Sequence, residues 1–273
     1  MRIELHHPLD GYYQGTRFDR SGVFKSLVFR GVELCGPWFE KYAPTMHDAV
    51  CGPAEEFSFI PAGPCRLKPG VGLLAPSPEP YDRFRLYDVL DPGRWEMEES
   101  EGATLFRHIM EPYYIYTKEV RSVGPDAFEI RHELLPMIPW EGTVYNHNFF
   151  TFGKFVTGPS RRIDFPFRPE GPWRAQYDSV GFTAGGVRFS RQILEGESVY
   201  NCGISKAGEQ GMPYEFTLSE GPLSVHVIGD VPVTHAVLWA NHRIACLEPY
   251  NELRAAAGET LRWSIRYELN IDE

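Results

Sequence analysis

Apolar and polar residues alternate along most of the chain. A period of two places successive side chains on opposite faces of a β-strand, and the β-branched and aromatic residues in these runs favour strands. Turn signals rich in glycine separate the runs, for example at residues 124–126, 195–197, 220–222 and 256–259. The alternating runs span residues 22–34, 83–90, 103–110, 113–120, 127–135, 161–167, 187–194, 214–220, 223–230, 235–241 and 260–269.

Few segments favour helix. Residues 40–50 and 251–258 could each form a helical turn, and Pro44 limits the first. The strand count, about fifteen, exceeds the roughly seven strands of a small sandwich. We therefore predict an all-β fold, a large antiparallel sandwich with minimal helix, formed by residues 1–273 as one domain. The Pro-rich stretch 72–83 is expected to be a long loop within that domain and a candidate rim of a site.

Charge narrows the set of partners. The formal net charge is −10, which argues against nucleic acid and anionic membranes as partners. Neutral sugars remain possible, whereas a polyanionic substrate would need a local cluster of Arg or Lys. The charge says nothing about oligomeric state.

The cysteines and the first residues of the chain indicate the cellular compartment. The five cysteines form no CxxC pair and are odd in number, which indicates reduced thiols. The first residues lack the apolar core of a signal peptide, and no apolar stretch of about 18 residues occurs. These features predict a cytoplasmic protein.

Common cofactor and catalytic motifs are absent from the sequence. There is no GxGxxG, Walker or GxSxG motif, so nucleotide use and a serine nucleophile have no support. His132-Glu133 begins like a zinc-protease helix, but Pro136 stands where the second histidine belongs. We interpret that pair as structural.

Two polar positions stand out within apolar strand segments. His147 lies between Asn146 and Asn148 and is followed by two phenylalanines. The amides could fix the tautomer of the imidazole, or the ring could simply be a hydrogen-bonded core histidine. Glu248 interrupts a second apolar run, and a buried carboxylate there must either pair with a cation such as Arg243 or serve a function.

Together these segments carry a resemblance to a known family. Asn146-His147-Asn148-Phe149-Phe150 resembles the Asn-His-x-(Tyr/Phe)-Phe element of aldose 1-epimerases, the galactose mutarotase-like proteins. Residues 246–249, Cys-Leu-Glu-Pro, followed by the Gly-Glu turn at 258–259 and a last strand, resemble the late part of that family. The resemblance covers about residues 145–153 and 235–269, and the early family motifs are not clearly present. It implies a β-supersandwich fold.

The resemblance also implies a mechanism. His147 would be the general acid that protonates the ring oxygen of a bound sugar, and Glu248 the general base that takes the proton of the anomeric hydroxyl. A histidine near its ordinary pKa suits proton donation at neutral pH, and partial burial would strengthen a glutamate as a base. This chemistry needs no metal and no cofactor.

Further residues are candidates for sugar contacts. Asn146 and Asn148 flank the implied acid, and Trp239 could stack on a sugar ring, as could Trp38, Trp140 or Trp173, although for each tryptophan taken singly a place in the core is favoured. Arg17 could anchor sugar hydroxyls or pair with Asp19. Glu56 could face the same pocket, whereas Glu55 would point to the other face of a strand; alternatively, both are solvated in a loop.

Two other functions stay open on the same fold. One is a non-catalytic carbohydrate- or metabolite-binding protein. The other is a lyase or hydrolase, and a lyase would need Arg17, Arg188 and Arg191 to converge on an acidic sugar. Fold alone does not decide among these functions.

Overall fold

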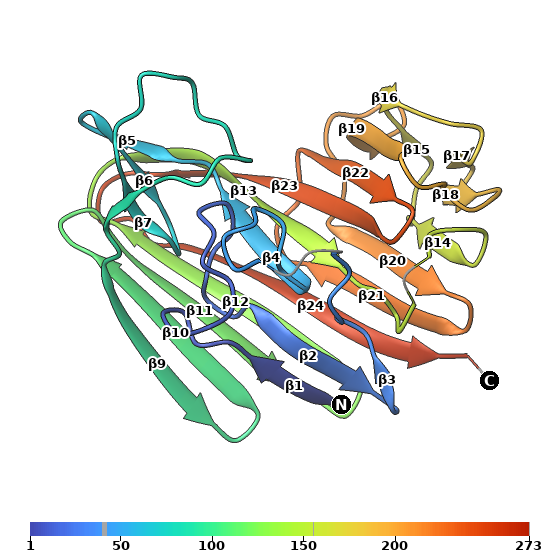
Figure 1. Ribbon diagram of the computed structural model, residues 1–273, viewed down its shortest axis with the longest axis horizontal. Helices are drawn as coiled ribbons and strands as arrows, with labels where there is room; N and C mark the ends of the chain where they lie inside the picture. The colour runs from blue at the N-terminus through green and yellow to red at the C-terminus, as the bar shows by residue number, and fades with distance from the viewer. Residues whose placement is uncertain (40–42, 155, 273) are drawn as a thin grey trace.

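The computed structural model describes residues 1–39, 43–154 and 156–272. Within these ranges the chain forms strands β1 to β24 and no helix, and every strand pairing is antiparallel (Figure 1). The all-β prediction is therefore confirmed. The described ranges also contain no helix long and apolar enough to cross a membrane.

Two large sheets lie one above the other in Figure 1 and form the body of the molecule. Sheet I has the strand order β17-β18-β14-β20-β21-β24-β12-β11-β10-β9. Its strands are β9 (Arg94–Ser100), β10 (Ala103–Met110), β11 (Tyr114–Ser122), β12 (Ala127–Pro136), β14 (Arg161–Asp164), β17 (Val180–Thr183), β18 (Gly186–Phe189), β20 (Glu215–Glu220), β21 (Leu223–Gly229) and β24 (Leu261–Ile271).

Sheet II has the strand order β15-β19-β22-β23-β13-β4, and β16 also pairs with β19. It joins an early strand, β4, to strands from the second half of the chain. Its strands are β4 (Gly52–Phe57), β13 (Trp140–Phe149), β15 (Pro169–Glu170), β16 (Trp173–Ala175), β19 (Ser198–Lys206), β22 (His235–Asn241) and β23 (Ala245–Ala255).

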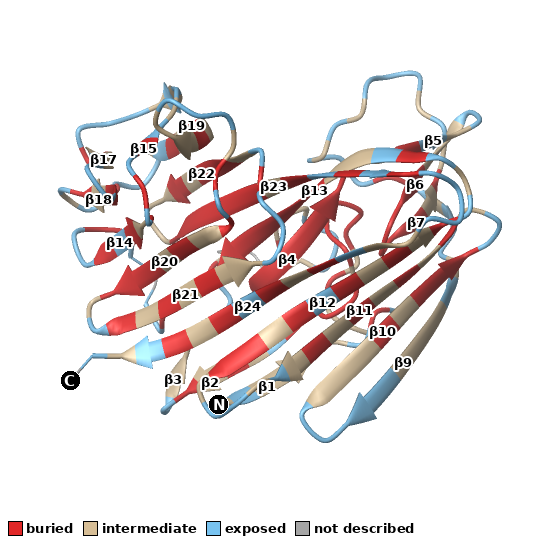
Figure 2. Ribbon diagram, turned by 180° about the vertical axis from the view of Figure 1, so that it is seen from behind, coloured by how far each residue is buried: buried red, intermediate tan, exposed pale blue. Residues whose placement is uncertain are grey.

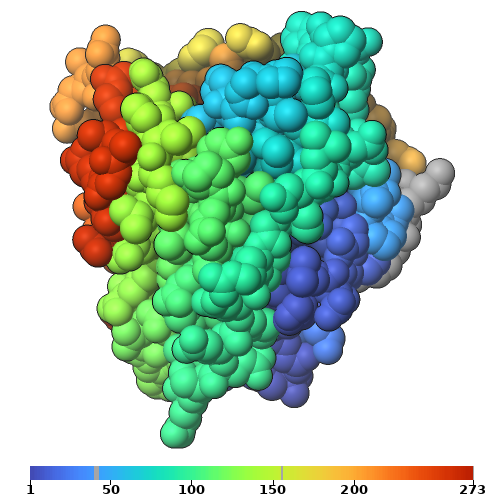
Figure 3. Space-filling view, turned by 90° about the vertical axis from the view of Figure 1, so that its left-hand side faces the viewer, coloured from blue at the N-terminus to red at the C-terminus, as the bar shows by residue number. Residues whose placement is uncertain are grey.

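Two small sheets from the N-terminal third complete the fold. One holds β1 (Arg2–Leu5), β2 (Phe24–Phe29) and β3 (Val32–Glu33). The other holds β5 (Ile60–Ala62), β6 (Cys65–Lys68), β7 (Gly72–Leu74) and β8 (Val89–Asp91). Figure 3 shows the N-terminal residues, in blue, packed beside the later segment drawn in teal and green.

The main core lies between sheets I and II. Leu238 and Leu247 of sheet II pack there with Ile130, Ile265 and other apolar residues of sheet I. Figure 2 shows buried residues concentrated along the central strands β12, β13, β23 and β24, while the edge strand β9 is largely exposed. Because strand side chains alternate, every second residue of sheet II points away from this core, toward its outer face.

The structure corrects three local predictions. Residues 83–88 are not strand, since β8 begins at Val89. Residues 251–255 belong to β23 rather than to a helical turn. In the segment 40–50, residues 40–42 lie outside the described residues, and 43–50 contain turns without helix. The predicted loop at 72–83 begins after β7 and continues to residue 88.

Candidate functional site

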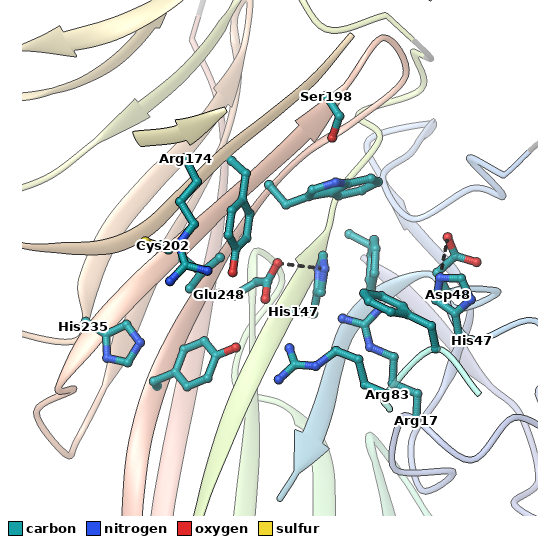
Figure 4. Close-up of a pocket in the computed structure, with 16 residues that line it drawn as sticks. Arg17, His47, Asp48, Arg83, His147, Arg174, Ser198, Cys202, His235 and Glu248 are labelled. Atoms are coloured by element: carbon teal, nitrogen blue, oxygen red, sulfur yellow. Dashed lines mark ion pairs between the residues drawn. The ribbon is translucent and has the colours of Figure 1, made fainter. Parts of the chain in front are cut away.

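A cavity of about 670 Å³ opens on the outer face of sheet II. Loop residues close it on the side opposite β16 and β19 (Figure 4). This volume suits a small molecule the size of a sugar. Its lining residues are Arg17, His47, Asp48, Arg83, Phe84, His147, Phe149, Arg174, Ser198, Tyr200, Cys202, His235, Val237, Trp239, Glu248 and Tyr250.

Strand alternation explains why sheet II can line both a core and a cavity. In β23, Leu247 enters the core, and Glu248 and Tyr250 face the cavity on either side of Pro249. In β22, Leu238 enters the core between Val237 and Trp239, which line the cavity. The same period of two that predicted the strands therefore selects the side chains of the site.

His147 and Glu248 meet directly at the wall of the cavity, as the dashed line in Figure 4 marks. The imidazole Nε2 of His147 on β13 lies 3.0 Å from the Oε1 of Glu248 on β23. Both side chains are at least 95% buried. Sequence analysis left Arg243 as a possible partner of Glu248; in the structure, Arg243 instead donates from Nη1 to the Trp38 carbonyl oxygen at 3.3 Å.

The environment of His147 favours a neutral ring. Phe149 stacks on it with ring centroids 3.7 Å apart, and Phe18 meets it edge-on. Burial lowers the pKa of His147, and the carboxylate of Glu248 offsets only part of that effect. An ionised carboxylate can only accept, so the neutral ring donates from Nε2. Nδ1 then has no partner among the described residues.

Arg17 borders the cavity near His147. Its Nε lies 2.6 Å from the Oε2 of Glu56, and its Nη2 donates to the Tyr145 hydroxyl at 2.9 Å. The alternative pairing with Asp19 is not formed, because Asp19 accepts from Ser21 and Tyr116 instead. Arg17 is thus held rigidly with one edge toward the cavity.

Glu56 is a buried anchor for cations rather than a solvated loop residue. It is 3% exposed in β4, and the hydroxyl of Tyr145 donates to it. Burial alone would raise the pKa of Glu56, but Lys68, Arg17 and Arg83 together lower it to about 2. Glu56 does not line the cavity itself; it holds two arginines that do.

Glu55 points to the opposite face of β4, toward sheet I. It pairs with Lys118 of β11 and accepts from the Asn146 amide at 2.7 Å. Tyr267 of β24 donates to the side-chain oxygens of both Asn146 and Asn148. These polar groups, buried between the sheets, satisfy one another, as buried polar groups must.

Consequently, the sequence candidates divide into two groups. His147, Glu248, Arg17 and Trp239 come together at the cavity. Asn146 and Asn148 alternate with His147 and point away from it, so a sugar in the cavity would not meet their side chains. Of the other tryptophans, Trp38 packs edge-on against Trp239 behind the lining, and Trp140 belongs to a separate core cluster.

Sequence reasoning missed several lining residues. Arg83 is the last residue of the loop 72–83 that composition marked as a candidate rim, whereas Phe84 falls in the segment 83–88 that was wrongly predicted to be strand. Tyr250 lies two residues after Glu248 and had to share its face once Glu248 was placed. Arg174, Tyr200 and His235 gave no signal of their own, because their segments come together only in the folded sheet.

The arginine cluster predicted for a lyase, Arg17 with Arg188 and Arg191, is not formed. Arg188 pairs with Asp164, and Arg191 pairs with Asp178 and Glu197, outside the cavity. Nor do any three His, Cys, Asp or Glu side chains in residues 1–39, 43–154 and 156–272 lie close enough together to hold a metal ion.

Comparison with known proteins gives matches in structure and none in sequence. No protein-family model and no curated protein matches the chain. A protein from Escherichia coli K12, provisionally described as an aldose 1-epimerase, covers 99% of this chain and 100% of its own at a TM-score of 0.59 and 13% identity. A galactose mutarotase-like protein from Lactobacillus casei covers 98% and 100%, with a TM-score of 0.53 and 13% identity.

A galactose mutarotase related enzyme from Lactobacillus acidophilus covers 100% of both chains at a TM-score of 0.55 and 8% identity. The chain has the galactose mutarotase-like fold. This confirms the predicted supersandwich. Identities this low establish the fold without fixing the activity.

Proposed function

We propose that this protein is an aldose 1-epimerase-type isomerase, which interconverts the anomers of a cyclic sugar. The observation that carries the proposal is the contact between His147 Nε2 and Glu248 Oε1 at the wall of a sugar-sized cavity. An acid and a base on neighbouring strands, both reached from one cavity, are the two groups that ring opening needs.

The reaction keeps the number of protons on the pair constant. Glu248 takes the proton of the anomeric hydroxyl while protonated His147 gives a proton to the ring oxygen. The bond between the anomeric carbon and the ring oxygen breaks, and an aldehyde forms. After rotation about the bond from the anomeric carbon to its neighbour, the two transfers run in reverse and close the ring on the other face.

The remaining lining residues fit sugar binding. Trp239 and Phe84 offer apolar surface for the ring, and Arg17 presents a rigid donor for its hydroxyls. All five cysteines are unpaired, which supports a reducing, cytoplasmic location. A small-molecule sugar is accordingly the proposed partner.

Anomer exchange measured by NMR across several aldoses tests this function. We expect His147→Gln and Glu248→Gln each to lower kcat by roughly 10²- to 10⁴-fold, the usual contribution of general acid–base catalysis. His226→Asn is a matched control, because His226 also pairs with a glutamate, Glu215 at 3.2 Å, but lies outside the cavity. It should leave exchange unchanged.

Two outcomes would contradict the proposal. One is exchange that survives unchanged in His147→Gln. The other is binding of sugars without accelerated exchange by the unmodified protein, which would favour the carbohydrate-binding alternative.

A further inference from the structure

Arg174 occupies an unusual position for an arginine in this chain. It extends from β16 at the edge of sheet II into the cavity, as Figure 4 shows. Its side chain makes no hydrogen bond or ion pair with the part of the chain that the structure describes. By contrast, Arg188 and Arg191 on the nearby strand and loop each pair with a carboxylate. Arg174 is an exposed residue, so its guanidinium group borders the cavity without a described protein partner and is accessible to a ligand.

Arg83 presents a second guanidinium group from the loop that follows β7. Its Nη1 donates to the Tyr145 hydroxyl at 3.2 Å, and its Nε lies 3.8 Å from Glu56. The side chain remains 39% exposed. These contacts fix one edge of the group and leave the rest accessible from the cavity.

Arg83 and Arg174 line one cavity together with Tyr200. Burial and Glu248 raise the pKa of Tyr200, and the two guanidinium charges oppose that shift. Figure 4 shows Arg174 and Arg83 on either side of Glu248. Tyr200 of β19 and Tyr250 of β23 line the same cavity.

The charge of the cavity is opposite to that of the chain. Arg17, Arg83 and Arg174 line it, against the carboxylates of Asp48 and Glu248. Behind the lining, the charge of Lys68 balances that of Glu56. The cavity therefore carries a local excess of positive charge where a ligand would enter, although the net charge of the protein is −10.

We propose that the cavity selects a sugar with an anionic substituent, a phosphate ester or a carboxylate, which Arg174 and Arg83 bind together. Guanidinium groups recognise both anions through paired, charge-assisted hydrogen bonds. A neutral sugar would leave Arg174 without a partner. This inference rests on the proposed function for the sugar, and it adds the substrate class.

Calorimetric binding tests the class directly, with glucose and galactose, their 6-phosphates, their uronates and inorganic phosphate as probes. We expect at least one sugar anion to bind about tenfold or more tightly than its neutral parent at low ionic strength, as one added charge-assisted contact allows. Salt should shrink that advantage.

Arg174→Ala should remove most of the advantage, and Arg174→Lys should keep part of it. Arg162→Ala is the matched control, because Arg162 is an exposed strand arginine on β14, outside the cavity. It should leave the preference intact. Equal binding of neutral and anionic sugars would overturn the inference, as would an anionic preference that Arg174→Ala does not change. Inorganic phosphate that binds as tightly as the sugar phosphates would also overturn it.

The two proposals fail separately. Anomer exchange of neutral sugars that depends on His147, without any anionic preference, would sustain the function and sink this inference. Binding of sugar anions that depends on Arg174, without anomer exchange of any sugar, would do the reverse.

Discussion

His147 has one ring nitrogen bound to a carboxylate and the other buried without a partner in the described chain. A second proton on this ring would sit on Nδ1, where nothing accepts it. Burial and this missing acceptor both work against the charged form, and Glu248 is the main group that favours it. The pKa of His147 therefore reflects a balance between burial, which lowers it, and the contact with Glu248, which raises it.

An NMR titration of the His147 ring tests this account. We expect a pKa below the ordinary value of 6.5 in the ligand-free protein, because burial dominates. Glu248→Gln should lower it further, since the attractive charge is removed while the ring stays buried. A pKa that rises in Glu248→Gln would show that the carboxylate does not stabilise the imidazolium.

The protonation state of His147 also predicts how catalysis depends on pH. The free pair must hold one extra proton to react, and His147 loses that proton as pH rises through its lowered pKa. We therefore expect kcat/KM to fall about tenfold per pH unit above that pKa. Stopped-flow polarimetry over pH 5 to 9 would measure it, and a rate that increases with pH would contradict the proposed role of His147.

At the scale of elements, β4 shows how one strand serves two environments. Glu56 faces the cavity side and holds arginines, while Glu55 faces sheet I and pairs with Lys118. Both faces of the strand are buried, so each carboxylate needs its own cations. Adjacent glutamates in one strand are tolerated because alternation separates their charges.

Glu55→Gln should therefore destabilise the fold strongly. Among the described residues, Lys118 would keep only Asp19 as an ionic partner, 3.4 Å away, in a buried site. We expect a loss of roughly 3 kcal/mol in the free energy of unfolding, measured by chemical denaturation. Glu141→Gln is the control: it removes an exposed pair with Arg254 and should cost less than about 1 kcal/mol. Equal losses in the two variants would refute the buried-pair account.

Much of this element-level arrangement follows from sequence, and part of it does not. Alternation located β10 at residues 103–110 and β22 at 235–241 as the structure has them. Alternation wrongly predicted a strand at 83–88. These residues form the loop that carries Arg83, and apolar and polar residues can also alternate in a loop that borders a cavity. Helix-forming residues at 251–255 were overridden by pairing with β13.

For the site, the sequence predicted His147, Glu248 and Arg17 as candidates, and the structure brings these three together at the cavity. The sequence could not identify Arg174, because that residue matters only once β16 lies at the edge of sheet II beside β19. The sequence also predicted Asn146 and Asn148 as candidates for substrate binding. Each is one residue away from His147 in the strand, so both side chains point to the opposite face, toward Tyr267. Counting residues from His147 would have separated them.

At the scale of the whole molecule, three buried histidines are held uncharged. Burial lowers the pKa values of His108, His132 and His147. His108 accepts from the Gly70 amide at Nδ1, and its Nε2 lies 2.9 Å from the Pro92 carbonyl oxygen, which accepts its proton. Protonation of Nδ1 would break the first of these bonds. The fold therefore binds protons less readily than the unfolded chain, and acid destabilises it.

His108 alone gives a measurable effect. Its folded pKa is about 4, against 6.5 for an ordinary histidine. The contribution of neutral His108 to the free energy of unfolding is complete above pH 6.5 and is lost as pH falls toward 4. The free energy of unfolding therefore decreases by about 2 kcal/mol between pH 7 and pH 5. Denaturant titrations at pH 7 and pH 5 should show that the free energy of unfolding changes less between the two pH values in His108→Asn than in the unmodified protein. Identical pH dependence in the two proteins would exclude this role for His108.

The pairing of distant strands also governs when the site can form during synthesis. Arg17 and Glu56 leave the ribosome early, while Glu248 lies on β23, near the end of the chain. Strand β24 must then insert beside β12, where Arg262 meets Glu133 from 129 residues earlier. Arg17 and Glu56 can pair with each other early, but a nascent chain that has not reached β23 lacks Glu248 and has no acid–base pair to assemble. Assembly of the site therefore depends on strands far apart in the sequence, and slow closure of these long-range contacts is the expected kinetic signature.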